Sequence, residues 1–129
     1  MNNKENLSSF IQKAAQRLEA KKVVKHQELY VPSIDEKIKI RNLTKDEITE
    51  CFEMEDSIKS DNYSIYLAVV EPDLREVAKE LKSRGQITEF VDVVDIFNMQ
   101  DRTSIVKEVM KLSEVISDKR VEVIEHLKN

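Results

Sequence analysis

The stretch PDLREVAKELKSRG, residues 72–85, carries the clearest helix signals in the sequence. Pro72 suits the first turn of a helix, where its missing N–H costs little, and Gly85 suits the left-handed position that ends one. The apolar residues between them repeat at helical spacing and form one face: Leu74, Val77, Ala78 and Leu81. We therefore expect a helix over residues 73–84, with Lys82 and Arg84 favourably placed in its last turn.

Apolar periodicity continues on the C-terminal side of this helix. After Thr88 we expect a short helix whose apolar residues are Phe90, Val91, Val94 and Phe97. From Thr103 to Leu127 the sequence again predicts a helix, because its apolar residues keep a 4-3-4 spacing: Ile105, Val109, Leu112 and Ile116, then Val123 and Leu127.

On the N-terminal side, Tyr63, Tyr66, Leu67 and Val70 predict a short helix that ends near Pro72. The polar residues from Ser57 to Asn62 predict a loop before it. Thr44 and Glu47 have the spacing of a capping box and open an earlier helix, on which Ile48, Cys51 and Phe52 face inward.

Residues 23–41 predict a β-hairpin. The run Val23–Val31 is β-branched and aromatic at both ends, and Ile38 and Ile40 alternate with charged residues, as in a strand with one solvated face. The two runs are joined across Pro32 to Asp35. Before the hairpin, residues 6–20 predict an amphipathic helix with the apolar residues Leu7, Phe10, Ile11, Ala14, Ala15 and Leu18.

These elements predict a mainly α (α+β) fold, a compact domain of about five to six helices with one small β-hairpin near the N-terminus. The 129 residues fit a single domain, and one glycine and two prolines are too few for an all-β fold. The expected core consists of Ile38, Ile40, Ile48, Phe52, Tyr66, Leu67, Val70, Leu74, Val77, Leu81, Phe90, Val94, Phe97, Val109 and Leu112.

Charge and composition disfavour several classes of partner. The net charge of −4 disfavours general binding to nucleic acid, whose phosphates attract basic surfaces. No apolar run is long enough to span a membrane or to act as a signal peptide, and the single cysteine cannot form an internal disulfide. We therefore expect a protein of a reducing cytoplasm, without nucleic-acid or membrane partners.

The residue pattern gives no positive support for an enzyme. His26, His126 and Cys51 are too scattered for a metal site, and a chain with one glycine lacks the turns of a nucleotide-binding loop. Asp92 and Asp95 are better explained as the acidic face of an amphipathic helix. We expect no catalytic residue, no metal and no cofactor. A helix-turn-helix over residues 73–84 and 88–99 is disfavoured, because its second helix would present carboxylates to phosphate.

Three segments resemble the XkdN-like family of phage tail assembly chaperones. They are LTKDEITECFEMED (residues 43–56), YSIYLAVVEPDLREVAKELK (63–82) and VDVVDIFNMQDRTSIVKEVMKLSEV (91–115). The resemblance covers about residues 28–116 and rests on apolar and capping positions. In the family a glycine often follows the serine that corresponds to Ser113. Here Glu114 follows it, so the last helix need not stop and is expected to run on toward Leu127.

The resemblance implies a protein that works by binding and uses no cofactor. Such chaperones bind the phage tape measure protein, keep this long helical chain soluble, and help recruit tail tube subunits. A DNA-associated helical regulator of a phage operon and a structural subunit of the virion are the alternatives.

The segments most free to bind a partner lie at the edges of the recognised region. Residues 1–20 and a C-terminal helical extension over 117–129 are expected to act as arms, unless both simply complete the core. At least one of them would grip a helical segment of the tape measure protein or another copy of this chain. The expected partner-binding residues are Leu7, Phe10, Ile11, Leu18, Ile116, Val123 and Leu127.

Overall fold

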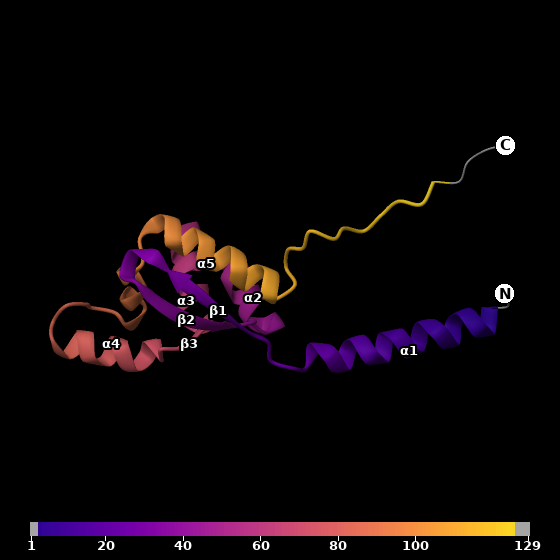
Figure 1. Cartoon of the computed structure of the whole chain (residues 1–129), viewed down its shortest axis with the longest axis horizontal. Helices are drawn as coiled ribbons and strands as arrows, with labels where there is room; N and C mark the ends of the chain where they lie inside the picture. The colour runs from indigo at the N-terminus through magenta and orange to yellow at the C-terminus, as the bar shows by residue number, and fades with distance from the viewer. Residues whose placement is uncertain (1–2, 126–129) are drawn as a thin grey trace.

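The computed structural model describes residues 3–125 and confirms a mainly helical α+β fold (Figure 1). A folded body, residues 26–115, carries α1 at one end and an extended C-terminal segment. The elements in chain order are α1 (Asn3–Lys21), β1 (His26–Val31), the 3-10 turn η1 (Pro32–Ile34), β2 (Glu36–Arg41), α2 (Lys45–Glu53), α3 (Ser57–Ala68), β3 (Val69–Glu71), α4 (Leu74–Ser83), the 3-10 helix η2 (Phe90–Ile96) and α5 (Met99–Leu112).

The expected hairpin is confirmed, but it belongs to a three-stranded antiparallel sheet in the order β1-β2-β3. The third strand comes from Val69–Glu71, where the sequence predicted the end of a helix; Val69 pairs with Ile40 instead. Ile38 and Ile40 point into the core while Lys37 and Lys39 stay on the other side, as the alternation predicted. Helix α5 packs against β1 and β2.

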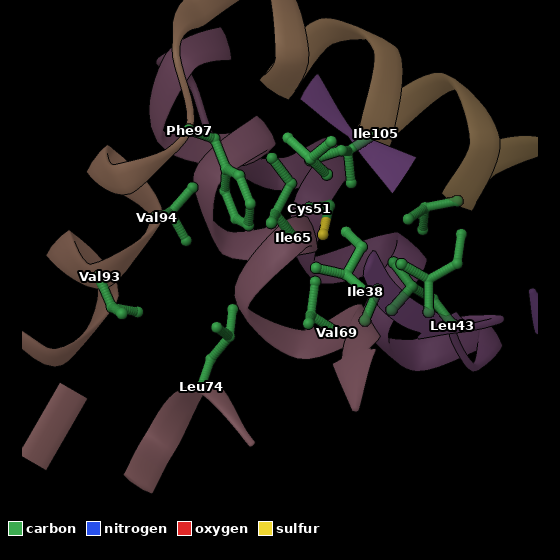
Figure 2. Packing of buried hydrophobic residues seen from close by; sticks show 14 of the residues in the cluster. Ile38, Leu43, Cys51, Ile65, Val69, Leu74, Val93, Val94, Phe97 and Ile105 are labelled. Carbon is green, nitrogen blue, oxygen red and sulfur yellow. The ribbon is translucent and has the colours of Figure 1, made fainter. Parts of the chain in front are cut away.

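The core lies between the sheet, α3, α5 and η2 (Figure 2). Of the expected core residues, the fully buried ones are Ile38, Ile40, Leu74, Val94, Phe97 and Val109. A second group is half-buried and packs around them: Ile48, Tyr66, Leu67, Val77, Leu81 and Leu112. Val70 is half-buried as well.

Phe52 and Phe90 were expected in the core, but the side chains of both are exposed, so this part of the prediction is wrong. Phe52 follows the buried Cys51 on α2, and one residue further along a helix turns the side chain about 100° away from the core. Phe90 opens η2, where Lys82 lies 4.9 Å above its ring centroid.

The segment 57–62 was expected to be a loop, yet α3 begins at Ser57. Asp56 is its N-cap: the carboxylate accepts hydrogen bonds from the backbone N–H groups of Ile58 (2.9 Å) and Lys59 (3.1 Å). Ser64 and Ile65 on this helix are buried, so packing and the cap together stabilise a segment whose first turn is polar.

The ends of α4 and α5 share one geometry. Gly85 has φ of +73°, and the N–H of Gln86 donates to the carbonyl of Leu81 at 3.0 Å, the left-handed cap that the sequence predicted. At the end of α5, Glu114 takes the left-handed position with φ of +64°, and the N–H of Val115 donates to the carbonyl of Met110 at 2.8 Å. A left-handed residue stops the helix even though it is not glycine.

The expected helix toward Leu127 is therefore wrong for every residue that the structure describes beyond Ser113. Residues 117–125 contain no regular secondary structure, and Leu127 lies outside the described part of the chain. The polar run Ser117–Arg120 also supplies no apolar face on which a helix could pack.

Candidate protein-binding surface

Helix α1 exposes a continuous apolar face. Its sequence is rich in good helix formers, and the apolar residues fall on one side at 3–4-residue spacing. No residue of α1 is buried. The exposed fractions of the large apolar side chains on this face are 61% for Leu7, 73% for Phe10, 57% for Ile11 and 63% for Leu18. The amphipathic helix expected over residues 6–20 is therefore confirmed as α1, but it adds no buried residue to the core.

Two exposed ion pairs connect the base of α1 to the body through one carboxylate. The guanidinium of Arg17 lies 2.6 Å from Oε2 of Glu114, and Nζ of Lys25 lies 3.0 Å from Oε1. Hydrogen bonds from Arg17 and then Lys25 lower the pKa of Glu114 to about 2. The residue that stops α5 thus also holds the end of α1.

A groove of about 860 Å³ lies between the C-terminal end of α1, the linker that follows it (residues 22–25) and the body. Positive side chains surround it, but Arg41 is paired with Glu47, Lys22 with Glu19 and both Arg17 and Lys25 with Glu114. The groove is therefore less cationic than its lysines and arginines suggest. Its apolar lining consists of Val23, Val24, Leu43, Ile48, Leu112 and Val115.

The other expected partner-binding residues belong to the C-terminal part of the chain, and of these Leu127 lies outside the described residues. Ile116 is 42% exposed and lines a small cavity of about 410 Å³ beside Arg17 and Glu114. Val123 is 86% exposed on the extended C-terminal segment, which leaves the body along a separate path from α1 (Figure 1). The structure therefore brings the N-terminal residues together on one face and adds Ile116 near its base.

Sequence reasoning missed exposed apolar side chains on the body. Phe52, Ile58 and Met99 are between 50% and 65% exposed. Phe52 was expected in the core, Ile58 was placed in a loop, and Met99 carried no expectation. Finer angular placement on α2 would have separated Phe52 from Cys51, whereas Ile58 gave no signal because the helix around it was not predicted.

Asp92, Asp95 and Cys51 have structural partners or packing in the fold. Asp92 accepts a hydrogen bond from the backbone N–H of Glu89 at 2.8 Å, and Asp95 lies 3.4 Å from the guanidinium of Arg102. Cys51 is buried, and burial raises the pKa of its thiol, which disfavours the reactive thiolate. Among residues 3–125, no three potential metal ligands gather at one place. His26 is exposed, and His126 lies outside the described residues.

The expected second helix of the disfavoured helix-turn-helix folds differently. Residues 90–96 form the 3-10 helix η2 instead of an α-helix, and Val93 and Val94 are buried against the body. The segment presents no α-helix that could enter a DNA groove. Within residues 3–125, none of the helices has the length and hydropathy needed to cross a bilayer.

No protein-family model matches the chain, and neither a curated protein nor a solved structure is significantly similar to it.

Proposed function

We propose that this chain is a tail assembly chaperone of a phage or prophage, of the XkdN-like kind. It binds the tape measure protein in the bacterial cytoplasm, helps recruit tail tube subunits and catalyses no reaction. The proposal starts from the resemblance over residues 28–116. Those residues coincide with nearly all of the folded body, and the shared capping position Thr44–Glu47 opens α2 there.

The observation that carries the proposal is the unburied apolar face of α1. Leaving a large apolar side chain in water forgoes about 1.5–3 kcal/mol of burial, so a face with four of them is suited to a partner. An amphipathic helix whose apolar residues recur every three or four positions binds another helix or a helical groove. A long helical client with exposed apolar stripes has the complementary chemistry.

The body supports this role as a scaffold. It has its own core, and α1 makes no extensive packing contact with any other element. The helix therefore projects from the body as an arm (Figure 1), and its large apolar side chains are exposed. The negative net charge of −4 would help to keep a complex with an apolar client in solution.

Co-expression with fragments of the tape measure protein encoded beside this chain tests the proposal. Wild-type protein should keep at least one fragment soluble and co-purify with it. The double variant Phe10→Ser, Ile11→Ser should lose the fragment, whereas Gln12→Ser, Lys13→Ser, on the opposite side of the same helix, should retain it. If no fragment becomes soluble, or both variants bind equally well, the proposed function or its site is wrong.

A further inference from the structure

The apolar residues of α1 are arranged symmetrically about the middle of the helix. They occupy positions 7, 10, 11, 14, 15 and 18, so the spacing is the same in both directions from the midpoint between residues 12 and 13. Helix α1 spans Asn3–Lys21, and this midpoint is close to its centre. Four of these residues, Leu7, Ile11, Ala14 and Leu18, have the 4-3-4 spacing of a two-helix seam.

We propose that, in the free protein, the apolar face of α1 is covered by α1 of a second copy in antiparallel orientation. A two-fold axis at the midpoint places Leu7 in one layer with Leu18 of the second copy. It places Ile11 in one layer with Ala14 of the second copy, and each layer occurs twice. Every layer then contains at least one large side chain, and Phe10 falls level with the small Ala15 of the second copy.

A parallel pair would fill the seam less evenly. It would place Ala14 against Ala14 and Ile11 against Ile11, so a nearly empty layer would follow a crowded one. It would also bring both bodies to the same end of the helices. In one chain the body lies at one end of α1 (Figure 1), so the antiparallel pair would put the two bodies at opposite ends. Asn3 of one copy then lies level with Lys22 of the other, so the helices overlap along their full length without reaching past the linker.

The size of the contact predicts a weak dimer. A helix of 19 residues is about 28 Å long, and one pair of such helices buries less than the ~1,200–2,000 Å² of standard stable interfaces. Lys4 would share the end layers with Lys21 of the second copy. Repulsion between these lysines weakens the pair at low salt, so added salt should tighten it.

A weak pair can be displaced. If the proposed function is correct, the tape measure protein competes with the second copy for the same face, and self-pairing protects the arm until its client is made. This consequence rests on the proposed function, whereas the pairing itself depends only on α1.

Cysteine cross-linking of the full chain tests the orientation. Differently tagged Leu7→Cys and Leu18→Cys chains, mixed under mild oxidation, should form a hetero-disulfide. Neither variant should cross-link alone, because eleven residues of helix would hold two identical positions about 16 Å apart, beyond the ~7 Å that a disulfide tolerates between Cα atoms. Wild-type protein controls for Cys51, which is buried.

Sedimentation equilibrium tests the pairing without new cysteines. Wild-type protein should show a concentration-dependent monomer–dimer equilibrium. Ile11→Asp should weaken it by at least about tenfold, and Gln12→Asp, with the same charge change on the opposite side, should not. A wild-type monomer at several hundred micromolar, or cross-linking of either single cysteine variant with itself, would overturn the proposal.

A tape measure fragment separates this inference from the proposed function. Suppression of the hetero-disulfide by the fragment supports a shared face, and binding without suppression contradicts it. Failure of every fragment to bind would count against the proposed function alone, because the cross-links judge the pairing independently.

Discussion

Of the two aromatic side chains Phe52 and Phe97, only that of Phe97 is buried in the core. Phe97, at the end of η2, is fully buried, whereas Phe52 on α2 is 65% exposed. Both were expected in the core, because an aromatic residue in a helical stripe is more often buried than not. Only the position of neighbouring elements decides between the two environments.

The two phenylalanines give a matched pair of substitutions. Phe97→Ala should lower the free energy of unfolding by about 3–5 kcal/mol, because it removes a fully buried ring and leaves a cavity. Phe52→Ala should change it by less than about 0.5 kcal/mol, as is usual for exposed side chains. Urea denaturation of both variants measures the difference. Equal losses of stability would show that Phe52 packs in the core.

The start of α2 is the best-connected helix terminus in the body. The backbone N–H of Glu47 donates to Oγ1 of Thr44 at 3.2 Å, and the N–H of Thr44 donates to Oε1 of Glu47 at 2.9 Å. Arg41 on β2 donates to both carboxylate oxygens of Glu47 at 2.8 Å. The capping box was predicted, but the tie to the strand required the fold. Arg41 is the main cause that lowers the pKa of Glu47 to about 2.

Glu47→Gln should therefore destabilise the protein by about 1–2 kcal/mol at neutral pH. The folded-state pKa of Glu47 lies below its ordinary value of 4.5, so its ionised form stabilises the fold above pH 4.5. That contribution is lost as the pH falls toward 2. Unfolding free energies measured from pH 7 to pH 2 should converge for wild type and variant in this window. If the difference in unfolding free energy between wild type and variant stays constant over this pH range, ionisation of Glu47 does not contribute to stability.

At the scale of the whole molecule, the structure separates a self-contained body from an arm. The core joins β1, β2, β3 and the helices from α2 to α5, and α1 adds no buried residue to it. The arm is attached through the linker and through the ion pairs of Glu114. If the proposed function is correct, stability depends on the body and partner binding on the arm.

Removal of residues 1–20 should leave the body folded, with a free energy of unfolding within about 1 kcal/mol of the full chain, since no buried side chain of α1 is lost. Removal of residues 1–31 should prevent stable folding, because β1 and the buried Val31 are lost with it. Circular dichroism and thermal denaturation distinguish the two. If removal of residues 1–20 already unfolds the protein, the body does not fold independently of α1.

The sequence alone determined the features that depend on neighbouring residues. The caps of α2 and α4, the amphipathic pattern of α1 and the alternation in β2 are set by side chains within a few positions of one another, and all four are present in the structure. Periodicity shows which side chains share a face, but it does not show whether another element packs on that face. The tertiary structure alone decided that the apolar face of α4 is covered and that of α1 is not. It likewise decided that Val69 joins a sheet and that Glu114 ends α5 beside Arg17 and Lys25, because each depends on residues far away in the chain.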